Sequence, residues 1–169
     1  LLASAAVAWM VAQRAQVLFG PAYQQSDQYV IYRLRDPLPK TPSDLVGRRI
    51  VVTRNSTHAA SLARLAQDWP GLRWTEVEDK DQLDLLQQVA TGAADATVAD
   101  STEFSLGRHF HPELRPAFKL AEAEAIAWAL APRSTDLLPQ VERYFSELES
   151  IGKLAEILER HRRSLVRFD

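Results

Sequence analysis

The sequence has 169 residues, of which 46% are hydrophobic and 25% are charged, as is ordinary for a globular protein with a buried core. Its formal net charge is −2, so it lacks the basic excess on which phosphate-binding surfaces depend, and we expect no nucleic-acid partner. It contains no cysteine, which excludes disulfides, thiolate metal sites and cysteine nucleophiles.

The chain begins with an apolar stretch, 1–19, that superficially resembles the core of a signal peptide. Gln13, Arg14 and Gln16 interrupt it, and no basic segment precedes it. Its continuous apolar part is also shorter than the ~20 residues that a membrane-spanning helix needs. We therefore interpret it as an internal part of the fold and expect the chain to be a fragment whose true N-terminus lies upstream.

A strand is predicted at 28–34, where β-branched and aromatic residues are concentrated. Pro37, Pro39 and Pro42 follow closely. Because proline fixes its own backbone and lacks an N–H group, this segment cannot continue a helix or a central strand. It is predicted to be a stiff connector at a boundary between two lobes.

Beyond the connector, short apolar strands alternate with amphipathic helices. Strands are predicted at 49–53, 72–77 and 96–99, and helices at 57–69, 81–90 and 102–110. Pro70-Gly71 would end the first helix, and Gly92 stands where a C-terminal cap is expected for the second. Strand–helix alternation over short loops predicts an α/β fold with a parallel sheet covered by helices on both faces.

A further apolar strand is predicted at 125–130, and two amphipathic helices follow it, one on each side of Gly152. The predicted domain organisation has four parts: 1–36, the C-terminal part of a first lobe with a hinge strand; 37–44, the connector; 45–125, a complete second lobe; and 126–169, a return strand and helices packing back towards the first lobe.

The turn Asn55-Ser56-Thr57 lies between a predicted strand and a predicted helix. Short polar side chains there can cap the helix, whose first N–H groups and positive dipole end favour an anion. Since ligands of open α/β sheets bind beyond the carboxyl ends of the strands, this turn could receive a carboxylate. A purely structural cap worth ~1 kcal/mol is the alternative.

A second candidate is Asp100, which follows the predicted strand at 96–99. Neighbouring parallel strands end at the same edge of a sheet, so Asp100 is expected beside the Asn55-Ser56-Thr57 turn. A carboxylate opposite an anion-binding turn suits a zwitterion such as an amino acid or a peptide. Here too the alternative is a helix cap, made by Asp100 or Ser101.

Other chemistry has little support in the sequence. His109 and His111 lack a third ligand at a recognisable zinc spacing, so no metal site is predicted. Ser56 and His58 do not sit in a G-x-S-x-G elbow, and no catalytic residue is assigned. The dinucleotide and P-loop glycine patterns are absent, and no cofactor is expected.

The segments Phe19-Gly20-Pro21-Ala22-Tyr23 and 44–50 (DLVGRRI) resemble the F-S-x-P-Y … D-L-x-G-x-x-I pattern of family 3 solute-binding proteins. Segments 55–58 (NSTH), 87–100 (QQVATGAADATVAD), 111–114 (HPEL) and 127–129 (AWA) resemble the regulatory domain of the membrane-bound lytic murein transglycosylase F family. The resemblance extends over nearly the whole chain.

The resemblance implies a periplasmic-binding-protein-like (type II) fold with one complete lobe and an incomplete other lobe. It implies a periplasmic parent protein, associated with the outer membrane, whose binding domain senses peptidoglycan-derived peptides and gates a transglycosylase domain absent from this chain. In the family, the positions of Asn55, Ser56, Thr57 and Asp100 contribute to the ligand cleft.

The sequence departs from the receptor pattern at the arginine that clamps a ligand carboxylate. Gln13 occupies that position, and the nearest arginine is Arg14, one residue later. We therefore include Arg14 as a candidate ligand-binding residue. The leading hypothesis is a non-catalytic sensing domain for muropeptides or amino acids, and the alternative is an amino-acid-binding receptor of an ABC importer.

Overall fold

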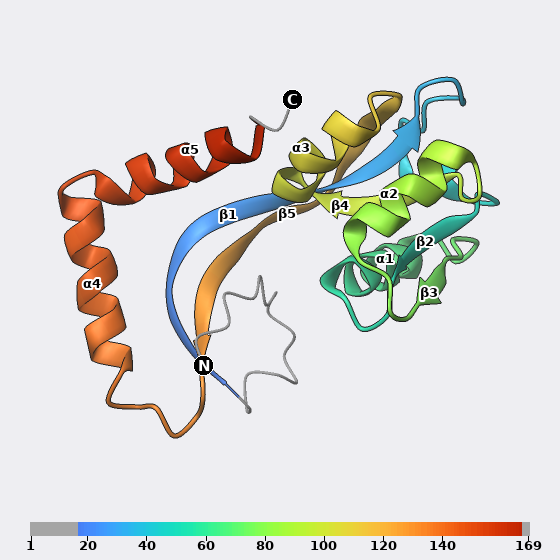
Figure 1. Ribbon diagram of the computed structural model, residues 1–169. Helices are drawn as coiled ribbons and strands as arrows, with labels where there is room; N and C mark the ends of the chain where they lie inside the picture. The colour runs from blue at the N-terminus through green and yellow to red at the C-terminus, as the bar shows by residue number, and fades with distance from the viewer. Residues whose placement is uncertain (1–16, 167–169) are drawn as a thin grey trace. The chain divides into compact units, whose positions relative to one another are not determined.

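The computed structural model describes residues 17–166, apart from the side chains of 122–124 and 161–166. Its elements, in chain order, are β1 (Leu18–Arg33), a short 3₁₀ helix η1 (Pro42–Leu45), β2 (Ile50–Thr53), α1 (Thr57–Asp68), β3 (Thr75–Val77), α2 (Gln82–Thr91), β4 (Ala96–Asp100), α3 (Ser101–Phe110), β5 (Leu114–Leu130), α4 (Leu138–Ser150) and α5 (Lys153–Val166) (Figure 1). The chain forms two compact units, one of which is Ser26–Ala123, while the segments that flank it form the other.

The five strands form one sheet in the order β3-β2-β4-β1-β5. Strand β2 is parallel to both β3 and β4, which confirms the predicted parallel core of an α/β fold. Strand β1 is antiparallel to β4, with Gln28 opposite Asp100 and Tyr32 opposite Ala96. The antiparallel direction of β1 was not predicted, because the sequence of a buried strand does not reveal its direction.

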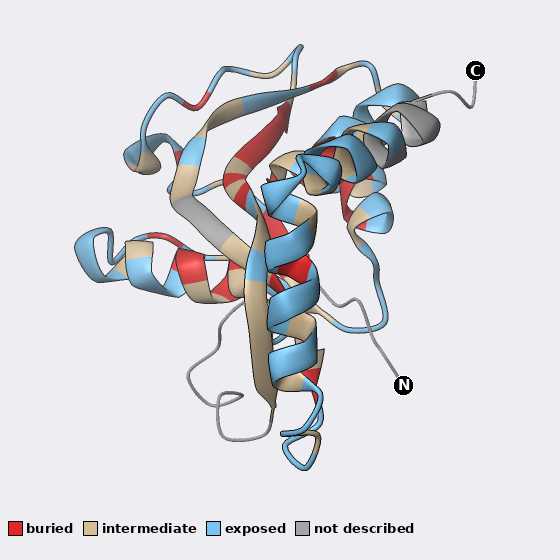
Figure 2. Cartoon of the chain, turned by 90° about the vertical axis from the view of Figure 1, so that its left-hand side faces the viewer, coloured by how far each residue is buried: buried red, intermediate tan, exposed pale blue. Residues whose placement is uncertain are grey.

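The core of Ser26–Ala123 has two layers, one on each face of the sheet. Successive strand residues point to opposite faces, so Val30 and Ile31 enter different layers. Leu62 of α1 packs in the first layer, and Leu86 of α2 and Phe104 of α3 pack in the second. Figure 2 shows buried positions concentrated on strands and on one side of each adjoining helix. The predicted helix layers on both faces are therefore confirmed.

Helix ends follow the predicted chemistry closely. The Ser56 side chain accepts a hydrogen bond from the backbone N–H of Ala59 at the start of α1. Asp81 does the same for Asp84 at the start of α2. Helix α2 ends at Thr91, and its C-cap is Gly92, whose φ of 86° is left-handed, the conformation that glycine adopts without a steric penalty.

The long strands differ most from expectation. Strand β1 begins at Leu18 rather than at residue 28, and β5 begins at Leu114 rather than at residue 125. Their added segments contain polar and small residues and are mostly half-buried or exposed. Because β1 and β5 are neighbours in the sheet, backbone pairing rather than an apolar side-chain pattern accounts for the extra length.

The other unit contains α4 and an aromatic cluster around Phe145, which is 4% exposed. The ring of Phe145 stacks on that of Tyr23, with centroids 5.5 Å apart. The ring of Trp128 meets it edge-on at 5.0 Å. The two predicted C-terminal helices are both present, and the described residues include no helix long and apolar enough to cross a membrane.

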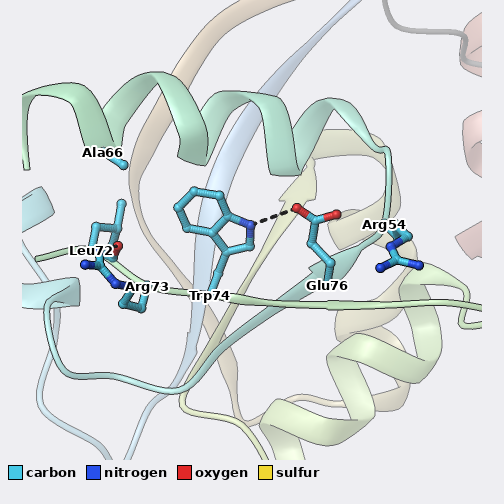
Figure 3. Close-up of a pocket in the computed structure, with 6 residues that line it drawn as sticks. All are labelled: Arg54, Ala66, Leu72, Arg73, Trp74 and Glu76. Atoms are coloured by element: carbon cyan, nitrogen blue, oxygen red, sulfur yellow. Dashed lines mark hydrogen bonds between the residues drawn. The ribbon is translucent and has the colours of Figure 1, made fainter. Parts of the chain in front are cut away.

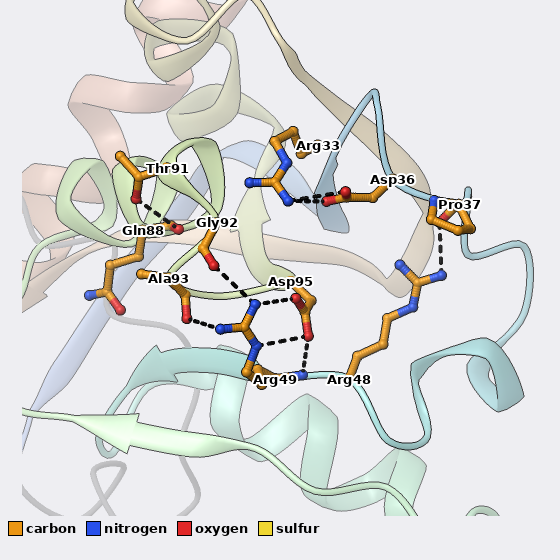
Figure 4. Close-up of polar contacts among 10 residues, drawn as sticks. All are labelled: Arg33, Asp36, Pro37, Arg48, Arg49, Gln88, Thr91, Gly92, Ala93 and Asp95. Atoms are coloured by element: carbon orange, nitrogen blue, oxygen red, sulfur yellow. Dashed lines mark hydrogen bonds and ion pairs between the residues drawn. The ribbon is translucent and has the colours of Figure 1, made fainter.

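A polar network joins the start of β2 to the loop before β4 (Figure 4). The carboxylate of Asp95 accepts hydrogen bonds from the backbone N–H of Arg49, at 2.8 Å, and from its guanidinium, at 2.6 Å and 3.2 Å. The same guanidinium donates to the carbonyl oxygens of Gly92 and Ala93. These contacts hold the pKa of Asp95 below its ordinary value, chiefly through the hydrogen bond from the Arg49 side chain.

Candidate ligand-binding site

The predicted turn lies between the end of β2 and the start of α1. Asn55 has a φ of 55°, in the left-handed region that asparagine tolerates better than most residues. This sharp change of direction places Ser56 at the N-cap, where its hydroxyl accepts from Ala59 at 3.1 Å. The first N–H groups of an α-helix have no acceptor within the helix. After capping by Ser56, the backbone N–H groups of Thr57 and His58 therefore remain suited to an anion.

Thr57 is tied to the central sheet. The side-chain amide of Gln28 in β1 donates to the Thr57 hydroxyl at 3.2 Å. Gln28 is fully buried, and the oxygen of the same amide has no hydrogen-bond partner among the described residues. The amide nitrogen of Gln28 therefore fixes the position of the Thr57 hydroxyl, and the amide oxygen remains available as an acceptor.

Asp100 ends β4 and precedes α3, as predicted. It lies directly opposite Gln28 in the β1–β4 register, which brings it close to the Asn55-Ser56-Thr57 turn. One oxygen of its carboxylate is 3.6 Å from Nε2 of His58, and the two side chains are 20% and 8% exposed. That separation is longer than a hydrogen bond, so Nε2 of His58 is buried without a hydrogen-bond partner among the described residues.

Glu103 completes this group. It lies three residues after Asp100, and its carboxylate accepts from the Asp100 backbone N–H at 3.3 Å. Burial raises the pKa of Glu103 above its ordinary value, the charge of Asp100 raises it further, and His58 opposes the rise. The carboxylate pair therefore favours a cation beside it, since a positive charge offsets the repulsion between the two acids.

The structure brings four of the five predicted residues into one region: Asn55, Ser56, Thr57 and Asp100. Arg14 lies outside the described residues. The sequence analysis missed Gln28, His58 and Glu103. The Asp-x-x-Glu spacing of Asp100 and Glu103 could have revealed Glu103, because this pattern is typical of a helix start. Nothing in the sequence distinguished Gln28, because a single polar residue at the start of a predicted apolar strand can have many roles.

A separate surface hollow of about 560 Å³ lies beside β3 and contains none of the predicted residues (Figure 3). Trp74 lines it, and its indole N–H donates to the Glu76 carboxylate at 3.2 Å. Arg54 pairs with Glu78, and Arg73 donates to the carbonyl oxygens of Pro70 and Leu72. Because both guanidinium groups are already engaged within the chain, the cluster around Asp100 is the stronger candidate site.

No protein-family profile matches the chain. Proteins named membrane-bound lytic murein transglycosylase F are similar to it over most of its length. The protein from Pseudomonas syringae pv. syringae is 36% identical over 150 residues, covering 88% of this chain and 30% of that protein. A protein from Alkalilimnicola ehrlichii, named membrane-bound lytic murein transglycosylase F 1, is 36% identical over 171 residues, covering 99% of this chain and 34% of that protein. The chain thus spans about a third of the length of these relatives.

Solved structures of binding proteins share the fold. A mutant of the arginine-binding protein ArgBP from T. maritima superposes with a TM-score of 0.78 at 24% identity, covering 92% of this chain and 66% of that one. The GluR0 ligand-binding core from Nostoc punctiforme, solved with L-glutamate, gives 0.76 at 17% identity, covering 94% and 71%. The fold is that of type II periplasmic binding proteins, and the resemblance predicted from the sequence is confirmed.

Proposed function

We propose that this chain is a non-catalytic ligand-binding domain that recognises peptidoglycan-derived peptides or amino acids in the periplasm and regulates a lytic transglycosylase domain beyond it. The observation that carries the proposal is the pairing of an anion-binding helix start at Thr57 with the carboxylates of Asp100 and Glu103. Gln28 links the two sides, since it donates to Thr57 and lies opposite Asp100 in the sheet.

This arrangement complements a zwitterion. A ligand carboxylate would accept hydrogen bonds from the Thr57 hydroxyl and the first N–H groups of α1. A ligand ammonium group would lie against the carboxylate of Asp100, whose side chain is 20% exposed. Amino acids and the peptide stems of peptidoglycan both carry these two groups. The names of the similar proteins, lytic murein transglycosylases, favour the peptidoglycan source over a nutrient amino acid.

Regulation would follow from the two-state behaviour of a binding-protein fold. A ligand that binds a closed state a hundredfold better than an open state shifts the equilibrium between them by ~2.7 kcal/mol. That energy is enough to modulate a neighbouring domain and too small for an all-or-none switch. Arg14, the proposed substitute for the receptor arginine, would complete the carboxylate contact in this proposal.

A second candidate function is an amino-acid receptor of an importer, and the fold likeness to an arginine-binding protein favours it. Calorimetric titration separates the two functions. Binding of a muropeptide without a response to free amino acids supports the sensor, whereas tight binding of one free amino acid supports the receptor. If neither ligand binds, the proposed site is wrong.

The role of Asp100 is tested in the same titration. Asp100→Ala should weaken binding at least tenfold, because a charge-assisted contact is worth about 1.5–3 kcal/mol. Asp68→Ala is the matched control, since Asp68 is an exposed acid at the far end of α1. Equal affinities of the two variants would remove Asp100 from the site.

A further inference from the structure

His58, Asp100 and Glu103 come from the start of α1, the end of β4 and the first turn of α3. Each offers one potential metal-ligand atom, and these three atoms lie within 4.8 Å of one another. The sequence separates His58 from the two acids by more than forty residues, so no local metal-binding motif marks them. We propose that these three side chains form a binding site for a divalent transition-metal ion, with Zn²⁺ as the representative ion.

The state of His58 is the independent observation that points to an ion. Its side chain is only 8% exposed, and its Nε2 atom has no hydrogen-bond partner among the described residues. Burial of a ring nitrogen without a partner costs free energy, because the atom has given up its bonds to water. This nitrogen lies 3.6 Å from Asp100, on the side where the cluster converges. A metal ion would satisfy the nitrogen and neutralise both acids together.

The ligand set selects the class of metal. An imidazole nitrogen with carboxylate oxygens suits zinc and other first-row transition metals, whereas Mg²⁺ and Ca²⁺ prefer oxygen ligands alone. Zinc bonds of about 2.0–2.2 Å place ligand atoms about 3.3–3.6 Å apart, so a small contraction of the cluster suffices. Three protein ligands also leave a coordination position open to an outside group.

This inference does not rest on the proposed ligand function, and it is tested with metal alone. Chelator-treated full chain is titrated with ZnCl₂ by calorimetry, without any organic ligand. We expect saturable binding with one ion per chain, weakened at least about tenfold in His58→Gln and in Glu103→Gln, since the loss of even a supporting partner of a metal ligand costs 10–100-fold. Equal affinity of these variants and the wild-type protein would overturn the proposal, as would the absence of saturable binding.

His111→Gln is the matched control. Nδ1 of His111 lies 3.8 Å from Glu113, so it is another histidine beside a carboxylate, outside the three-ligand cluster. The affinity of His111→Gln for zinc should equal that of the wild type. A loss of affinity as large as that of His58→Gln would also overturn the proposal. At the same zinc concentration, zinc should raise the Tm of the wild type and of His111→Gln more than that of Glu103→Gln. The ligand titrations proposed above should also be run with chelator present. Failure of the metal site then leaves the proposed ligand function standing, and failure of the ligand site leaves the metal proposal standing.

Discussion

The side-chain amide of Gln28 donates to the hydroxyl of Thr57 at 3.2 Å and so joins the central strand β1 to the first turn of α1. Gln28 is fully buried, yet the oxygen of its amide has no partner among the described residues. An apolar residue of similar size would avoid that unsatisfied atom. If the proposed site is right, glutamine serves here to position the Thr57 hydroxyl rather than to stabilise the fold.

Gln28→Leu separates these two roles. The substitution removes a buried unsatisfied oxygen together with one hydrogen bond, so we expect the free energy of unfolding to stay within about 1 kcal/mol of the wild type. Ligand affinity should fall several-fold, because the Thr57 hydroxyl is no longer oriented. Urea denaturation and calorimetric titration measure the two effects. A large loss of stability with unchanged affinity would show that Gln28 is only a structural residue.

The cap of α1 can be tested through Ser56. Ser56→Ala removes the acceptor of the Ala59 N–H and should lower the free energy of unfolding by ~1 kcal/mol. Asp81→Ala, which removes the corresponding cap of α2, should cost a similar amount and serves as the control. Only the Ser56 variant should also weaken anion binding at α1. If both variants bind ligand like the wild type, the start of α1 contributes nothing to recognition.

The parts of the fold that could be predicted are those encoded by local chemistry. The strand at β2 and the helices α1 and α2 have apolar periodicity, and polar caps and Gly92 mark their ends. The clustering of the turn with Asp100 followed from the rule that parallel strands end at one edge of a sheet. These features depend on residues close in sequence or on the geometry of a parallel sheet.

The parts that could not be predicted depend on pairing between distant segments. The early start of β1 reflects its backbone neighbours in the sheet, and its own side chains there give no alternating pattern. Gln28 and His58 are likewise brought to Asp100 only by the sheet order and by the antiparallel register of β1 with β4. The predicted boundary at 37–44 stays a prediction.

The contact between α2 and α3 depends on Gly107. A Cβ atom built at Gly107 would lie 2.2 Å from a methyl carbon of Leu86, which is fully buried. Alanine normally favours a helix over glycine by about 1 kcal/mol, but overpacking a core costs about 1–3 kcal/mol. Gly107→Ala should therefore lower the free energy of unfolding. Adding Leu86→Val should recover part of the loss in a double-mutant cycle, and strict additivity of the two changes would contradict the contact.

The ion pair of Arg49 and Asp95 predicts a specific dependence of stability on pH. Hydrogen bonds from Arg49 lower the pKa of Asp95 in the folded protein below its ordinary value of 3.8. The stabilisation is therefore fully present above pH 3.8 and is lost as the pH falls through the lower folded pKa. Asp95→Asn should be less stable than the wild type at neutral pH, and the difference should shrink in acid.

The dependence on salt and a control variant at another acidic residue make the test of Asp95 more specific. The Arg49 side chain is 60% exposed, so solvent and salt screen the pair, and the loss at neutral pH should be no more than about 1 kcal/mol. Asp68→Asn, at an exposed acid of α1, is the matched control variant. Thermal unfolding of the three proteins between neutral and acid pH measures the difference, and parallel curves would show that Asp95 has an ordinary pKa in the folded state.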